Sequence, residues 1–468
     1  MLFSSLTFIF VFLPLVLGLY FIAKDKYRNH ILLLASLIFY SWGEPKFIVL
    51  MLISIIFNYI IALIIDKKRE KKLLPKILLI FSLLVNIGML FSFKYLNFFI
   101  ININSIFNSN ISLFEIALPI GISFYTFQIL SYVVDVYKKE VPVQKNIFAL
   151  GTYIAFFPQL IAGPIVRYST IAEQLEKRKV TLSKFTDGFR RFILGFAKKI
   201  IIANNVALVA DTIFNSTTVT EYSWLIILVA LLAYTLQIYF DFSGYSDMAI
   251  GLGKMFGFDF LENFNYPYIS QSITDFWRRW HISLSSWFRD YVYIPLGGNR
   301  VNKIKWIRNI FVVWLLTGLW HGASWNYVIW GLYFFVILLS ERLLTGKLLE
   351  KLPKIVKWIY AFILINIGWL IFRIEDVSIL KELFVNLVTL KSSDVVEFLR
   401  MNYSLLDKLP YMIVGLIVMF PIYPAIENKL KKYTIYKYIR DIFIMILLTL
   451  SICFLLSNSY NPFIYFRF

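Results

Sequence analysis

The chain has 468 residues, of which 59% are hydrophobic, 19% aromatic and only 16% charged. Soluble domains average about 45–50% apolar and about 25% charged residues, so this composition excludes a water-soluble fold. The formal net charge of +19 does not indicate nucleic-acid binding, because the basic residues form clusters between apolar segments, as in the cytoplasmic loops of membrane proteins.

The first third of the sequence alternates apolar segments with basic loops. Segment 2–22 lacks the basic start and the cleavage site of a signal peptide, so we interpret it as a retained helix. Because basic loops stay on the cytoplasmic side, we expect the chain to start outside and the polar stretch 101–110 to lie outside as well. The other apolar segments of this part are 30–42, 47–65, 75–93 and 113–136.

Segment 146–166 cannot be a simple crossing, because basic loops border it on both sides. Pro158, Gly163 and Pro164 also interrupt any helix within it. A re-entrant element fits this pattern, and such backbone is tolerated at membrane depth only inside protein or along a wet cavity. We therefore expect the middle of the protein to enclose a cavity.

The region after residue 180 opens with an amphipathic helix, whose apolar stripe consists of Phe185, Phe189, Phe192 and Phe196. This spacing indicates an in-plane or cavity-lining helix. Segment 223–242 then crosses once, and 309–320 with 322–341 form a hairpin between two basic loops. The remaining segments are 358–372, 410–426 and 441–458, with the mixed-charge loop 374–409 outside.

Together these segments predict an all-α polytopic membrane protein of roughly 11 crossings, with re-entrant and in-plane helices in its centre. We find no soluble domain, so residues 1–468 are expected to form one integral-membrane domain. Its parts are N-terminal helices (1–136), a core with re-entrant elements (137–345) and C-terminal helices (346–468). Both termini are expected outside a cytoplasmic (inner) membrane.

Cysteine and histidine are too scarce for a metal centre. Cys453 is the single cysteine, which excludes an intrachain disulfide and a cysteine-based cluster. The chain has three histidines, and no suitable ligand spacing completes a zinc site. We therefore expect no bound metal or other cofactor.

The densest polar and aromatic segment runs from Asp275 to Asp290. We predict one helix here, because residues 272–275 resemble a capping box and Asp275 stands four residues before Arg279. On such a helix Trp277 and His281 share one face. Tryptophan and arginine are typical of an interfacial helix, but interfacial anchoring does not require His281.

A second histidine, His321, lies inside the apolar segment 314–325 and is followed by Gly322. An ionisable residue at membrane depth is a functional hypothesis by default. Imidazole accepts a proton near neutral pH, so His321 is a candidate general base. The alternative is a structural histidine that bonds a backbone carbonyl between helices.

Two carboxylates, Asp241 and Asp247, lie beside or within apolar sequence. We expect them, like Asp275, to be structural charge partners. The cations expected to pair with Asp241 and Asp247 are Arg278, Arg279 and Arg289. Acid–base chemistry by either carboxylate is the less favoured interpretation.

Several short motifs, taken in order, resemble the membrane-bound O-acyltransferase (MBOAT) family. They are Ser41-Trp-Gly-Glu-Pro45, Pro119-Ile-Gly-Ile-Ser-Phe-Tyr-Thr-Phe127, Phe157-Pro-Gln-Leu-Ile-Ala-Gly-Pro-Ile165, Asp241-Phe-Ser-Gly-Tyr-Ser-Asp247, Trp277-Arg-Arg-Trp-His281, Leu319-Trp-His-Gly322 and Asn461-Pro-Phe-Ile-Tyr465. The branch resembled O-acetylates exported polysaccharides such as alginate and peptidoglycan. The D-alanyl transfer proteins of teichoic acid modification are similar at a greater distance.

The resemblance implies a ring of helices around a central funnel, with His321 catalytic and His281 as the second conserved polar position. It implies acetyl-CoA as donor and, outside the membrane, a partner acetyltransferase that modifies the polysaccharide, with the loop 374–409 as one candidate dock. Membrane lipids are the remaining partners. The candidates for binding donor or acceptor are Trp277, Arg278, Arg279, Trp280, Arg289, Trp320 and Ser324.

Three alternatives stay open from sequence. A transporter or flippase is also polytopic with broken helices. A D-alanyl transferase takes its donor from a carrier protein rather than from acetyl-CoA. A scaffold without activity is disfavoured, because both His281 and His321 are present.

Overall fold

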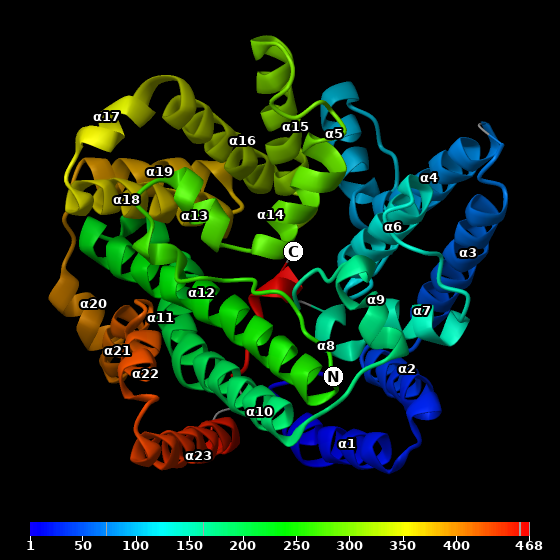
Figure 1. The fold of residues 1–468 in the computed structure, drawn as a ribbon. Coiled ribbons are helices and arrows are strands. Elements are labelled where there is room, and N and C mark those ends of the chain that lie inside the picture. Colours follow the sequence, from blue (N-terminus) through cyan, green and yellow to red (C-terminus); the bar gives the residue numbers. More distant parts are fainter. Residues whose placement is uncertain (72, 162, 458–459, 468) are drawn as a thin grey trace. The chain divides into compact units, whose positions relative to one another are not determined.

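The computed structural model describes residues 1–71, 73–161, 163–457 and 460–467. These residues form helices and connecting segments, with no strand among them, which confirms the all-α prediction (Figure 1). The chain divides into two compact units, Met1–Phe192 with Ser246–Leu261, and Ile193–Tyr245 with Glu262–Phe468. Helices α10 (Leu182–Ala197) and α12 (Trp224–Met255) each contribute residues to both units.

Seven helices of the described chain are long and apolar enough to cross a membrane, or eight if one bent pair counts as a span. They are Ile48–Lys67, Leu73–Lys94, Leu182–Phe214, Trp224–Met255, Trp325–Lys351, Lys354–Arg373 and Thr434–Ser457. Other predicted crossings correspond to shorter helices, such as the 17-residue helices α2 (Asp25–Ser41) and α6 (Ile122–Lys138). The polytopic character is thus confirmed, and the count of roughly 11 stays a prediction.

The first unit is built around α6, whose residues are almost all buried. Its other elements are η1 (Phe8–Phe12), α1 (Leu13–Ile22), α2, α3 (Ile48–Lys67), α4 (Leu73–Lys94), α5 (Leu96–Phe107), α7 (Ile147–Ala155), α8 (Phe157–Leu160) and α9 (Tyr168–Glu176). Buried amides join α3 to α4, because the Asn58 side-chain oxygen accepts from Ser82 Oγ at 2.7 Å and Asn86 Nδ2 at 2.9 Å. Such polar contacts are a common means of association between membrane helices.

The predicted break near Pro158 is confirmed. Helix α7 ends at Ala155, and the single turn α8 starts at Phe157 with Pro158 in its first turn. Proline fits there because the first amides of a helix need no intrahelical acceptor. Gly121 lies against this turn with φ +75°, and a Cβ there would lie 2.6 Å from the carbonyl oxygen of Leu160, so only glycine fits. The re-entrant path itself stays a prediction.

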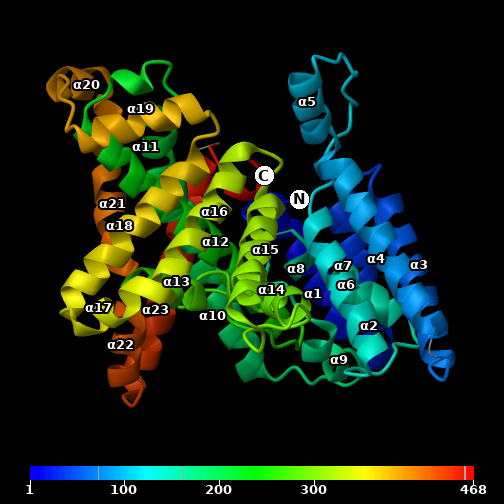
Figure 2. The same cartoon turned by 90° about the horizontal axis from the view of Figure 1, so that it is seen from above.

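Residues 96–114 form a helix followed by an extended return segment (α5 in Figure 2). Asn97 pairs its amide with the backbone of Phe114, at 2.8 Å and 3.0 Å, and Asn104 pairs in the same way with Ile111. Within the polar stretch 101–110, Asn104 therefore has a structural role, because it holds the return segment against the helix. The side of the membrane on which this segment lies stays a prediction.

The second unit starts at Ile193 within α10. Its further elements are η2 (Lys198–Ala203), α11 (Asn204–Phe214), η3 (Val219–Glu221), α12, η4 (Pro267–Ile269), α13 (Ile273–Arg279), α14 (Ile282–Phe288), η5 (Arg289–Tyr293), α15 (Lys303–His321), α16 (Trp325–Ser340), η6 (Glu341–Thr345), α17 (Gly346–Lys351), α18 (Lys354–Arg373), α19 (Val377–Val388), α20 (Val395–Met401), η7 (Tyr403–Lys408), α21 (Leu409–Val418), α22 (Ile422–Leu430), α23 (Thr434–Ser457) and η8 (Ile464–Arg467). Helix α12 is mostly buried and mostly apolar, although it also carries the charged residues Asp241 and Asp247.

The predicted hairpin of 309–320 and 322–341 is confirmed as α15 and α16, which lie side by side (Figure 1). Two glycines allow this close approach. A Cβ at Gly318 would lie 2.4 Å from the carbonyl oxygen of Tyr327, and one at Gly331 would lie 2.4 Å from that of Trp314. Small residues at helix contacts are typical of membrane proteins.

Two C-terminal segments differ in form from the prediction. Segment 410–426 is not one straight helix, because α21 and α22 meet at a 60° bend beside Pro421, which cannot donate a backbone hydrogen bond. The region 374–409, predicted as a loop, contains the helices α19, α20 and η7. Asp376 and Asp394 cap the first two of these helices through their side-chain oxygens.

Candidate active site

His321 is the last residue of α15 and is buried among aromatic rings. Its imidazole lies edge-on to Trp320 at 5.0 Å, to Trp330 of α16 at 5.0 Å and to Phe372 of α18 at 5.1 Å between ring centroids. Three helices thus define the position of this ring. The surrounding aromatic rings restrict the access of water to the imidazole.

Gly322 has a specific steric role directly after His321. A Cβ at this position would lie 2.2 Å from Cε2 of Tyr327, far inside van der Waals contact. The group that comes close to the backbone of Gly322 is the ring of Tyr327. The backbone of Gly322 is extended, so space rather than conformation requires glycine here.

His281 lies between α13 and α14, where the predicted continuous helix is broken. Its φ is +45°, in the left-handed region, and Trp280 before it is extended. The prediction that Trp277 and His281 share one helix face is therefore wrong. Histidine is among the residues enriched in this conformation, but it still needs support from its surroundings.

Residues 263–265 supply that support through four hydrogen bonds. Asn263 accepts from the amide of Ile282 at 2.9 Å through its carbonyl, and from Ser283 N at 3.1 Å and Oγ at 2.8 Å through its side chain. The amide of Asn265 donates to the carbonyl of Arg279 at 2.9 Å. These distant partners compete with helical hydrogen bonding, so a local helix signal could not predict the break.

Trp320 brings the two histidines together. Its ring centroid lies 5.9 Å from that of His281 and 5.0 Å from that of His321. His281 is buried, and burial lowers the pKa of His281 to about 4, so it is neutral at neutral pH. Its Nδ1 has no hydrogen-bond partner among the described residues, so it has capacity to accept or donate toward a substrate.

The three candidate tryptophans differ in their distance from the histidines. Trp320 touches both of them, whereas Trp277 contacts Trp330 at 5.5 Å and so lies one ring away from His321. Trp280 is buried against Trp369 at 4.8 Å and belongs to the hydrophobic core of the unit. Of the three, Trp320 is the one that contacts both histidines, and Trp280 packs in the core.

The polar candidates are spread around the break. Arg279 pairs with Asp275 at 3.0 Å, which confirms the pairing predicted from their spacing of four residues. Arg278 is exposed, and Arg289 is exposed with its guanidinium 2.7 Å from Asp290. Ser324, directly before α16, is half-buried, and among the described residues its hydroxyl makes no capping bond.

Asp241 and Asp247 are charge partners, as predicted, but of other cations than Arg278, Arg279 or Arg289. Asp241 forms an ion pair of 2.6 Å with Lys199, and both side chains are almost completely buried, while Asp247 pairs with Arg191 at 2.8 Å. The predicted partners all lie in the aromatic segment 275–290. The partners in the structure are Arg191, on α10, and Lys199, on the η2 turn that continues α10. Helix α10 packs closely along α12, so tertiary packing decided the pairing.

The buried pair of Lys199 and Asp241 also holds the C-terminal segment of the second unit. The amide of Ile464 donates to Asp241 Oδ2 at 2.8 Å, and the Lys199 ammonium donates to the carbonyl of Pro462. Phe463 stacks on Tyr245 at 4.8 Å. Sequence reasoning missed Lys199, although a lysine at the start of the apolar run 200–203 was a visible signal.

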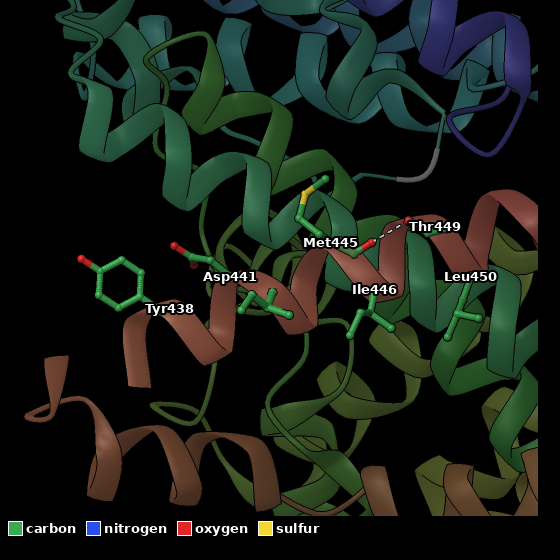
Figure 3. A pocket seen from close by; sticks show the side chains of 7 residues that line it. Tyr438, Asp441, Met445, Ile446, Thr449 and Leu450 are labelled. Carbon is green, nitrogen blue, oxygen red and sulfur yellow. Dashed lines mark hydrogen bonds between the residues drawn. The ribbon is translucent and has the colours of Figure 1, made fainter. Parts of the chain in front are cut away.

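A shallow apolar groove follows one face of α23 (Figure 3). It is lined by Tyr438, Asp441, Ile442, Met445, Ile446, Thr449 and Leu450. None of the candidate site residues lines it. Helix α23 is largely exposed, as expected of a helix that faces lipid.

Comparisons with known proteins identify the relatives of this chain. The family model of the membrane-bound O-acyltransferases matches residues 60–374, a range that contains both histidines. The chain is 44% identical over 409 residues to a probable alginate O-acetylase of Pseudomonas aeruginosa, covering 86% of this chain and 78% of the relative. It is 40% identical to the Pseudomonas putida protein of the same description over the full length of both chains. A peptidoglycan O-acetyltransferase of Helicobacter pylori is 34% identical, over all of this chain and 98% of the relative. The chain therefore belongs to the membrane-bound O-acyltransferase family.

Proposed function

We propose that this chain moves an acetyl group from acetyl-CoA on the cytoplasmic side to a hydroxyl reached from outside, for O-acetylation of an extracytoplasmic polysaccharide. The observation that carries the proposal is the pair of His281 and His321 on one indole, within a family of O-acyltransferases. Relatives described as alginate and peptidoglycan O-acetylases support a polysaccharide as the final acceptor.

In the proposed reaction His321 is the general base. It takes the proton of the acceptor hydroxyl while the oxygen attacks the thioester carbonyl carbon. The carbon–sulfur bond then breaks, and the imidazolium returns its proton to the CoA thiolate. A base in this position typically contributes about 10²–10⁴-fold in rate.

His281 has a second role in the proposal. Since burial lowers the pKa of His281, its neutral ring can donate one hydrogen bond to the thioester carbonyl oxygen. Arg278 and Arg289, both exposed, are the proposed contacts of the CoA phosphates. Trp277, Arg279, Trp280 and Ser324 complete the proposed surroundings.

The wider organisation is part of the same proposal. The segment 137–345 contains both histidines and is the proposed catalytic core of one domain, entered through a central funnel. The protein is placed in the cytoplasmic membrane with both termini outside. An extracytoplasmic partner protein completes transfer to the polysaccharide, with 374–409 as its proposed dock.

The test uses the whole protein in proteoliposomes with radiolabelled acetyl-CoA and a hydroxyl acceptor. Wild type is expected to release CoA, His321→Ala to lose at least about 10²-fold in rate, and His30→Ala to remain active. His30 is the matched control, because it is exposed and absent from the site. Full activity of His321→Ala refutes the base role.

The same assay identifies the acyl donor when acetyl-CoA and a D-alanyl carrier protein are supplied separately. Consumption of a D-alanyl carrier protein but not of acetyl-CoA would contradict the proposed donor and leave the base role intact. Movement of lipid or polysaccharide without consumption of any thioester would replace acyl transfer by a flippase function.

A further inference from the structure

Glu341 is a buried carboxylate that no step of the proposed reaction uses. It follows α16 and begins η6. Its Oε1 accepts the amide of Ile273 at 2.6 Å, and its Oε2 accepts the amide of Thr274 at 2.9 Å and the hydroxyl of Thr274 at 2.7 Å. Both carboxylate oxygens are thus directed at the first residues of α13.

These hydrogen bonds supply part of the N-terminal capping of α13 that neighbouring residues usually provide. Ser272 is the capping residue of α13, and its hydroxyl accepts from the amide of Asp275, at 3.0 Å. The amides of Ile273 and Thr274 have no acceptor within a helix that starts there. Glu341 therefore satisfies amides that local sequence leaves open, from a position far along the chain.

Both elements joined by Glu341 lead to the candidate site. Helix α16 carries Trp330, which contacts His321. Helix α13 carries Trp277, which packs on Trp330, and its end continues directly into His281. A shift of α13 along α16 would change the contact between the tryptophans and move His281 relative to His321.

We propose that Glu341 is a positioning residue, which fixes the offset of α13 against α16 and so the distance between His281 and His321. This inference rests on the proposed function of the two histidines. A carboxylate suits the role because both of its oxygens only accept, as three donors require. Glutamine keeps the shape but presents an NH₂ group to one of the donors.

The geometry predicts a graded series of variants. Misplacement of a catalytic group by about 1 Å can reduce the rate by about 10²-fold. We expect Glu341→Ala to reduce kcat by about that factor and Glu341→Gln by about 10-fold, with little change in the KM for acetyl-CoA. Thr274→Val removes one of the three bonds, so its effect is expected to be smaller and to disappear in the Glu341→Ala background.

A readout without activity separates this inference from the proposed function. Diethyl pyrocarbonate labels accessible imidazoles, and mass spectrometry resolves the three histidines of the chain. His281 is buried and is expected to label slowly in wild type and several-fold faster in Glu341→Gln, with exposed His30 as internal reference. The exposed Glu350→Gln on α17 is the matched control and is expected to leave labelling and kcat unchanged.

The outcomes distinguish the two hypotheses. Wild-type kcat and wild-type labelling of His281 in Glu341→Gln and Glu341→Ala, beside an inactive His321→Ala, would overturn the positioning role alone. An active His321→Ala would refute the proposed function, while the labelling still reports whether Glu341 holds His281. If Glu341→Ala does not fold, the isosteric Glu341→Gln carries the test.

Discussion

Loss of Lys199 removes an ammonium group that pairs with the buried Asp241 carboxylate at 2.6 Å. Both side chains are at most 3% exposed, so water cannot take the place of the missing ammonium. Removal of one member of a buried ion pair typically costs about 3–5 kcal/mol, because it leaves an uncompensated charge. We expect that loss of stability for Lys199→Met.

The neutral double variant Lys199→Met with Asp241→Asn tests the reasoning. It removes both charges, and it should recover most of the stability, because exchange of a buried pair for neutral groups is often nearly neutral. Thermal unfolding in detergent, followed by tryptophan fluorescence, measures both variants. The tail bonds to Pro462 and Ile464 add a second readout, since carboxypeptidase should digest the single variant faster.

Two results would refute this account of the pair. Lys199→Met could unfold at the temperature of wild type, which would mean that Asp241 is solvated or protonated at no cost. The double variant could instead be as unstable as the single one, which would assign the loss to packing of the lysine stem rather than to charge.

Two further predictions concern the histidines. In Gly322→Ala the new Cβ would lie 2.2 Å from Cε2 of Tyr327 and would force that ring aside. We therefore expect a loss of about 1–3 kcal/mol in the free energy of unfolding and reduced CoA release, and unchanged values would contradict this steric account. His281 stays neutral in the folded protein down to about pH 4, while the unfolded chain binds its proton below about pH 6.5. Wild type should therefore lose up to about 1.4 kcal/mol per pH unit relative to His281→Gln between these limits as pH falls, and parallel stability profiles would contradict the shift.

Local sequence predicted those features that depend on a few neighbouring residues. The pairing of Asp275 with Arg279 follows from their spacing on one helical turn. The interruption beside Pro158 follows from the missing amide of proline. The hairpin of α15 and α16 followed from basic loops at both of its ends.

The site itself could be predicted only in part. His321 was identified from its apolar surroundings and its motif, but the rings of Trp330 and Phe372 around it come from α16 and α18. The periodicity of residues 275–290 predicted a helix through His281. That prediction failed because Asn263 supplies hydrogen bonds that no pattern within the segment reveals.

By itself the sequence determined that this protein belongs in a membrane, since an apolar content of 59% leaves no water-soluble alternative. It also supplied two histidines as candidates. Only the tertiary structure decided that Trp320 brings His281 and His321 together, that Lys199 rather than an arginine neutralises Asp241, and that Glu341 caps α13. The physical reason is that a buried charge or an unpaired backbone amide must find a partner, and tertiary packing determines which group lies close enough. Packing brings together segments that are far apart in the chain, so local sequence does not reveal that partner.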